Sequence, residues 1–274
     1  VQPSAEVPDS GVMPLSAFFG ADNAFPLLAN RRICEGAAGG DGMPLVFSHQ
    51  LDISTLQPGD FRITRADGSI GSLVCVTPMP ALDEGELRTI LLIGEYGSAE
   101  NQPVQVDIVG NLLSIDGSLN FRNSSSTVIA LEEGPSLIYA EVVPESQWDL
   151  GKELSTGLRF GAPGNGCPER TQQVVRVVWT GGITKPGGDE IDDVERRAYK
   201  VFVEDDAGEL EMIVPFAVAD LVDGDNVCTY ICARHASHVR QAARARLANK
   251  LHVGDCAPPC VLVIKETSIP QVKK

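Results

Sequence analysis

The chain has 274 residues, of which 43% are apolar, and it contains 27 glycines, 18 prolines and seven cysteines. The apolar share is that of a folded globular protein and excludes wholesale disorder. A formal charge of −15 excludes a general nucleic-acid binder, because phosphate binding needs clustered Lys and Arg. No apolar run is long enough for a membrane-spanning helix.

Residues 1–30 form a proline-punctuated lead with scattered apolar side chains. An ordered terminus must be held by packing on something. One hypothesis is a donated strand, which fills an open groove on a neighbouring copy through backbone pairing. The alternative is that the lead packs on its own domain. The side chains that would enter the groove are Val1, Val7, Val12, Leu15 and Phe18.

Residues 31–143 predict a first β-sandwich, because short apolar runs alternate with turn residues. Ala66–Ser69 is a hairpin-type turn signal. Val104, Val106 and Ile108 are expected on one face of a strand. The predicted strands are 45–47, 61–63, 73–76, 89–93, 104–108, 128–131 and 137–139.

The run from Val46 to Thr64, VFSHQLDISTLQPGDFRIT, resembles the opening of bacterial Ig-like domains of the S-layer type. The resemblance implies that Phe47 enters the core, that residues 52–55 form a capped turn, and that Phe61 begins a strand. Gln50 departs from the family, which often has proline there, and Cys75 is unusual for it. The resemblance implies a surface or structural module and no catalytic residue.

Residues 144–170 are rich in Gly and Pro and predict a linker or long loop between two domains. Residues 171–274 predict a second sandwich with strands at 174–179, 199–203, 210–214 and 261–264. Residues 232–251 contain no Gly or Pro and place apolar residues at helical spacing, which predicts a helix. The fold class is therefore mostly β: two β-sandwich, Ig-like domains with one short helix near the C-terminus.

The seven cysteines indicate an oxidising compartment, and the odd number leaves one over. A disulfide between Cys34 and Cys75 is expected to cross-link the first domain. Two further disulfides are expected among Cys228, Cys232, Cys256 and Cys260. Cys167 is either the odd thiol or a partner for that group. The alternative is a zinc site, because Cys228, Cys232, His235 and His238 have ligand side chains at short spacing.

Secretion is expected, since the sequence begins at Val1 without a basic and apolar leader, as a processed chain would. The triplet Asn123–Ser125 is an N-glycosylation acceptor, which predicts an exposed loop around Asn123.

Charge is segregated along the chain. No acidic residue lies between Asp225 and Asp255, whereas the rest of the chain carries 17 basic and 37 acidic residues. This basic segment could dock on the acidic body of another copy and form an open, head-to-tail assembly. The alternatives are a solvated basic helix and a site for acidic glycans or phosphates. The basic residues are Arg234, Arg240, Arg244, Arg246 and Lys250.

Asp220, Asp223 and Asp225 offer oxygen ligands at short spacing, which suits a structural calcium ion. Ordinary Asp and Gly turn chemistry is the alternative, and no other cofactor is expected. The sequence contains no serine-nucleophile elbow, P-loop, zinc-protease or dinucleotide-binding motif, so no enzyme is predicted.

These patterns predict a secreted structural protein, the subunit of an extracellular fibre or surface layer. Its copies would assemble head to tail through strand and charge complementarity, with copies of itself as partners. The alternative is a monomeric cell-surface adhesin or glycan-binding module, which would use Arg240, Arg244 and Arg246 for a salt-sensitive contact.

Overall fold

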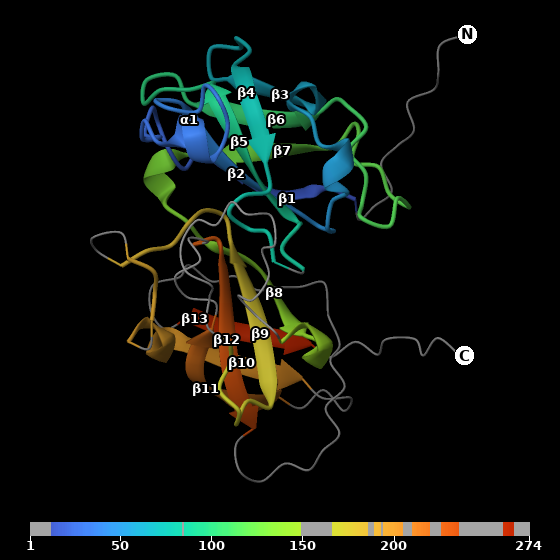
Figure 1. Cartoon of the computed structure of the whole chain (residues 1–274), viewed down its shortest axis with the longest axis vertical. Coiled ribbons are helices and arrows are strands. Elements are labelled where there is room, and N and C mark those ends of the chain that lie inside the picture. The colour runs from blue at the N-terminus through green and yellow to red at the C-terminus, as the bar shows by residue number, and fades with distance from the viewer. Residues whose placement is uncertain are drawn as a thin grey trace. The chain divides into compact units, whose positions relative to one another are not determined.

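The computed structural model describes residues 12–83, 85–148, 166–185, 189–192, 194–204, 210–219, 226–235 and 260–265 (Figure 1). The chain divides into two compact units. Unit 1 consists of residues 1–135 and 180–182, and unit 2 consists of residues 136–179 and 183–274. Each unit contains one large sheet, which confirms the mostly β fold class predicted from the sequence.

Unit 1 is a seven-stranded sheet in the order β3-β6-β7-β1-β2-β5-β4. All neighbours are antiparallel except β1 and β7, which are parallel. All seven strands contribute side chains to one core, so the sheet curves around it. The strands are β1 (Pro14–Phe18), β2 (Asp41–Phe47), β3 (Phe61–Arg65), β4 (Ser72–Thr77), β5 (Thr89–Glu95), β6 (Pro103–Ile108) and β7 (Ser125–Ile129).

The N-terminal lead packs on its own unit, because β1 lies in the middle of the sheet. Ala17 pairs with Leu45 on one side and with Val128 on the other. Val12 and Phe18 are buried and Leu15 is half-buried. The donated-strand hypothesis is therefore wrong for residues 12–18, since burial within one chain needs no association with a neighbour. Val1 and Val7 lie outside the described residues.

The turn implied by the S-layer resemblance is present as the 3-10 turn η1 (Ile53–Thr55). The Asp52 carboxylate accepts hydrogen bonds from the backbone N–H and the hydroxyl of Ser54, at 3.0 and 2.7 Å. Phe47 and Phe61 are buried in the core on either side of this turn, as that resemblance implies. The local geometry follows from Asx-type capping.

Val104 does not share a face with Val106 and Ile108, contrary to the expected alternation. Thr64 pairs with Gln105 and Arg65 with Pro103, so Val104 is the extra residue of a β-bulge. A bulge breaks the two-residue period and turns one side chain out of the core. Val104 is 42% exposed, whereas Val106 is fully buried.

Unit 2 is a six-stranded sheet in the order β13-β10-β11-β12-β9-β8. β10 and β13 are parallel and the other neighbours are antiparallel. β13 also contacts β8, so the two ends of this order come together. The strands are β8 (Leu137–Val143), β9 (Gln173–Trp179), β10 (Tyr199–Glu204), β11 (Leu210–Ala219), β12 (Cys228–His235) and β13 (Cys260–Lys265).

The boundary between the two units lies at Pro135–Ser136, earlier than the sequence predicts. β8 was expected to close the first sandwich, but Ala140 on β8 pairs with Val177 on β9. Residues 144–170 therefore connect two paired strands of unit 2 and do not link domains. Gly and Pro mark a connection, but they carry no information about which sheet the flanking strands join.

The helix predicted at residues 232–251 does not begin there, because β12 continues to His235. Cys232 and Ala233 pair with Val174 and Gln173 on β9. Sheet pairing overrides the helix propensity of alanine at these positions. Residues 236–251 lie outside the described residues. The α-helix that the structure describes, α1 (Ala29–Arg32), lies in unit 1 and not near the C-terminus.

Candidate functional site

The centre of the unit 2 sheet is buried on both faces. Every residue from 174 to 179 of β9 and from 228 to 233 of β12 is buried. Val175, Val177 and Ile231 point into the apolar core. Arg176 and Tyr230 occupy the opposite face, so a charged side chain and a phenol are held away from water.

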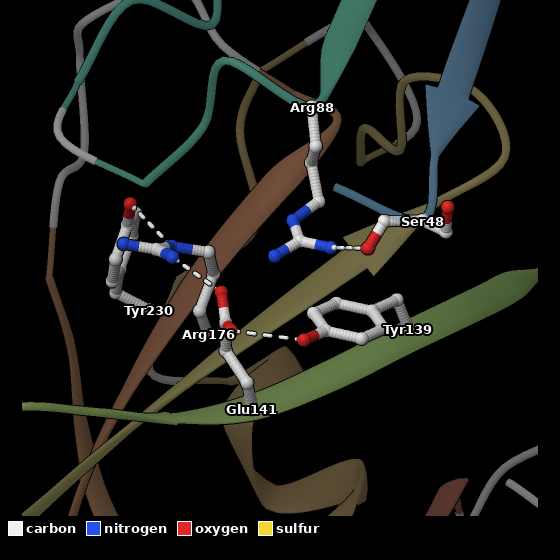
Figure 2. Close-up of polar contacts among 6 residues, drawn as sticks. All are labelled: Ser48, Arg88, Tyr139, Glu141, Arg176 and Tyr230. Carbon is white, nitrogen blue, oxygen red and sulfur yellow. Dashed lines mark hydrogen bonds and ion pairs between the residues drawn. The ribbon is translucent and has the colours of Figure 1, made fainter. Parts of the chain in front are cut away.

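Arg176 joins three neighbouring strands through a buried polar cluster (Figure 2). Glu141 on β8 and Tyr230 on β12 are its cross-strand partners in the sheet register. The Arg176 Nε donates to the Tyr230 hydroxyl at 2.8 Å, and its Nη1 forms an ion pair with the Glu141 carboxylate. The Tyr139 hydroxyl donates to the other oxygen of Glu141 at 2.9 Å.

The electrostatics of this cluster keep Arg176 charged. Burial alone would lower its pKa, but the attraction of the Tyr230 oxygen and the Glu141 carboxylate outweighs burial and raises the pKa of Arg176. A general acid or base needs a pKa near the working pH, which a guanidinium so held does not have. The cluster is therefore a permanent tie between β8, β9 and β12, since its cation and anion neutralise each other.

Unit 1 has buried polar ties of its own. Asp41 is fully buried and accepts backbone N–H bonds from Asn23, Tyr96 and Gly97, at 3.0, 2.7 and 2.9 Å. Burial, and then the charge of Asp41, raise the pKa of Tyr96 well above 10.0. Arg88 donates to the Ser48 carbonyl at 3.1 Å (Figure 2). These contacts fix loops to the sheet.

Two disulfides are present among the described residues. Cys34 is bonded to Cys75, the pair expected from the sequence, and this bond ties the segment after α1 to β4. Cys167 is bonded to Cys232, which is the second of the two roles expected for Cys167.

The prediction that Cys228, Cys232, Cys256 and Cys260 form two disulfides among themselves is therefore wrong, because Cys232 pairs outside this group. Cys232 is already bonded to Cys167, and Cys228 is buried on β12 and belongs to neither disulfide. The bond to Cys167 also removes Cys232 from the zinc site considered as an alternative. Sequence proximity suggested Cys256 and Cys260 as partners, whereas the sheet pairing of β12 with β9 holds Cys232 near the segment that precedes β9.

The face of β10, β11 and β12 that points away from the apolar core carries an exposed group of apolar and cationic side chains. This group is here called the basic sheet face. Val214 pairs with Arg234 across β11 and β12, and the Arg234 guanidinium lies 5.8 Å from the centre of the Phe216 ring. Met212 and Val214 are 49% and 37% exposed. The exposed members of this face are Lys200, Met212, Val214 and Arg234.

Unit 1 carries an acidic counterpart, here called the acidic loop cluster and formed by loops 66–70, 98–102 and 131–133. The Asp67 and Ala66 backbone N–H groups donate to Asn101 and Gln102, and the Gln102 amide donates to the Glu132 carboxylate at 2.8 Å. These bonds hold the three loops together. The exposed carboxylates of the cluster are Asp67, Glu100, Glu132 and Glu133.

Local hydrogen bonds keep two of these carboxylates ionised. Bonds from Ser69 lower the pKa of Asp67 below 3.8, and the bond from Gln102 lowers the pKa of Glu132 below 4.5. The sequence alone did not predict this cluster, because its members lie far apart in the chain, from Asp67 to Glu133. The Asp67-Gly68-Ser69 turn was the one local signal.

The structure describes only part of the other sites predicted from the sequence. Arg234 is exposed, while Arg240, Arg244, Arg246 and Lys250 lie outside the described residues, as do Asp220, Asp223 and Asp225. The calcium site therefore stays a prediction. Within the described residues, no group of three or more His, Cys, Asp or Glu could hold a metal ion. Asn123 is exposed at a positive φ of 70°, two residues before β7 begins at Ser125.

Comparison of the chain with protein-family models, curated proteins and solved structures found no match. The likeness of residues 46–64 to S-layer Ig-like domains thus rests on those residues alone and stays a prediction. In the part of the chain that the structure describes, no helix is long and apolar enough to cross a membrane.

Proposed function

We propose that this chain is a secreted structural protein whose copies associate head to tail into an extracellular fibre or surface layer. The observation that carries the proposal is the distribution of charge between the two units. Unit 1 contains six basic and 17 acidic residues, whereas unit 2 contains 16 basic and 20 acidic residues. The formal charges are thus −11 and −4.

Complementary charge favours association of unlike surfaces. Unit 2 contains the basic segment that begins at Arg234, and Arg234 is exposed. A cationic surface on one unit attracts the acidic unit of another copy and repels its own kind. Because the two surfaces differ, such a contact is heterologous and can repeat without closing.

The disulfides support an extracellular location. Disulfides persist in oxidising compartments, and each unit contains one that fastens a loop to its sheet. The exposed acceptor Asn123 is the proposed site of N-linked glycan in such a compartment. We propose no catalytic role, since the polar cluster at Arg176 is a structural tie.

The test is the particle size of the full chain, measured by light scattering at about 0.02 M and about 1 M salt, since salt screens exposed charges. We expect large particles that dissociate at high salt. Replacing Arg240, Arg244 and Arg246 by Glu should leave monomers at both salt concentrations. The matched control, R31E/R62E/R122E, changes the net charge equally at exposed arginines of unit 1 and should still assemble.

A monomer at both salt concentrations and at high protein concentration would overturn the proposal and favour the binding-module alternative. Assembly that does not depend on salt would also contradict it, because charge would then not drive the contact.

A further inference from the structure

We infer that the basic sheet face of unit 2 is the docking surface for the acidic loop cluster of unit 1 from a second copy. This inference rests on the proposed function and names the two surfaces that meet. Both surfaces are open, because Lys200 and Arg234 on one and Asp67 and Glu132 on the other are exposed.

The basic sheet face has the composition of a protein-binding surface. Its centre is apolar, because Phe202 pairs with Met212 and Phe216 lies under Arg234. Its cations, Lys200 and Arg234, are on the flanking strands β10 and β12. Interfaces commonly combine an apolar centre with a polar rim, and arginine is enriched in them.

The acidic loop cluster offers the complementary arrangement. Ile70, in the first of these loops, and Val104, on β6 two residues after Gln102, are 53% and 42% exposed. Arg65 at the end of β3 is the cation next to the first loop, and its guanidinium is already bonded to the Ser69 hydroxyl and to the Ile70 and Glu95 carbonyls, at 3.1, 3.3 and 2.8 Å. The outward charge of the cluster is therefore negative.

The match favours a second copy as the occupant. Aliphatic side chains on each surface would cover one another, and the carboxylates of one surface would meet the cations of the other. Both surfaces are preformed: sheet pairing fixes Val214 beside Arg234, and the Gln102 bonds fix Glu132. Such ordering before contact lowers the entropic cost of binding.

The experiment uses two charge-reversed full-length variants, K200E/R234E and D67K/E132K. Each variant alone juxtaposes like charges and should lose at least about tenfold in association constant by sedimentation velocity at low salt. An equal mixture should recover assembly, because the reversed face of one variant matches the reversed loops of the other. The control variant E35K reverses the charge of an exposed side chain of unit 1 outside the loop cluster. It should associate like the original chain.

The outcomes separate this inference from the proposed function. If the original chain assembles in a salt-dependent manner and both variants assemble equally well, the inference fails while the proposed function stands. If the variants lose assembly but the mixture does not recover it, the pairing of these two surfaces is also wrong. If the original chain is monomeric, the proposed function itself fails. Circular dichroism spectra equal to that of the original chain show that the variants are folded.

Discussion

Arg176 illustrates how a single buried residue can organise a sheet. Its side chain is 2% exposed, and it is bonded to one residue on each neighbouring strand. Its guanidinium carbon also lies 5.2 Å from the centre of the Tyr230 ring, so a cation–π contact adds to the hydrogen bond. A buried ion pair is sensitive to loss of either partner, because the remaining charge is left in a poorly solvated place.

We therefore expect Arg176→Met to lower the free energy of unfolding of unit 2 by about 3–5 kcal/mol. The matched control is Arg62→Met at the cross-strand pair Arg62–Asp107, where the arginine side chain is 54% exposed. An exposed pair should cost less than about 1 kcal/mol. Both tryptophans, Trp148 and Trp179, lie in unit 2, so tryptophan fluorescence in a urea titration follows that unit, and circular dichroism follows the control. Equal losses in the two variants would show that Arg176 is not a tie.

Individual residues were predictable where the signal is local. Asp52 precedes Ser54 at the spacing of an Asx turn, and the structure contains that turn. The role of Arg176 was not predicted, because its partners Glu141 and Tyr230 are 35 and 54 positions away. One signal was present. Apolar residues on both sides of Arg176 without alternation are typical of a strand buried on both faces.

At the scale of elements, strands were easier to predict than their neighbours. Most predicted strands are present, but β8 was placed in the wrong unit and β1 was missed within the lead. β1 pairs in parallel with β7, more than 100 positions along the chain. Sequence periodicity shows which face of a strand is buried, but it does not show which strand lies beside it.

The disulfides link elements that are far apart in sequence, 41 positions for Cys34–Cys75 and 65 for Cys167–Cys232. Loop-closure entropy predicts that removing either bond costs about 4 kcal/mol. We expect C167A/C232A to lower the urea midpoint of the tryptophan transition, because both tryptophans are in unit 2. C34A/C75A should lower the midpoint of unit 1, followed by circular dichroism.

Peptide mapping without reduction checks the pairing itself. The peptide that contains Cys228 and Cys232 should be linked to the peptide of Cys167. Absence of a link between this peptide and the peptide of Cys167 would contradict the structure.

For the whole molecule, the net charge of −15 conceals an uneven distribution. Most of the excess acid belongs to unit 1, which contains six arginines and no lysine. The sequence alone showed the basic segment after Asp225. It did not show that the acidic loops 66–70, 98–102 and 131–133 come together. Contacts of Asn101 and Gln102 join these loops, and such contacts form only in the folded chain. The two surfaces that we propose to meet therefore exist only once the chain is folded.

The lowered pKa values of Asp67 and Glu132 predict how assembly responds to acid. A carboxylate is charged above its pKa, so Asp67 and Glu132 stay negative as the pH falls to 3.8 and 4.5, the ordinary pKa values of the two groups. We expect the association constant, measured by light scattering, to hold from about pH 7 to about pH 4.5 and to fall only below about pH 3.8, where the two carboxylates become neutral. A loss between about pH 7 and about pH 6 would instead indicate histidine titration and contradict this contact.

Acid also brings the whole chain toward its isoelectric point, which is about 4.6, and low net charge promotes non-specific clustering. The K200E/R234E variant separates the two effects. Non-specific clusters should form near the isoelectric point in this variant as in the original chain, whereas the salt-sensitive assembly at neutral pH should be present only in the original chain. If the variant and the original chain give the same particle sizes at every pH, the Asp67 and Glu132 carboxylates do not meet this face.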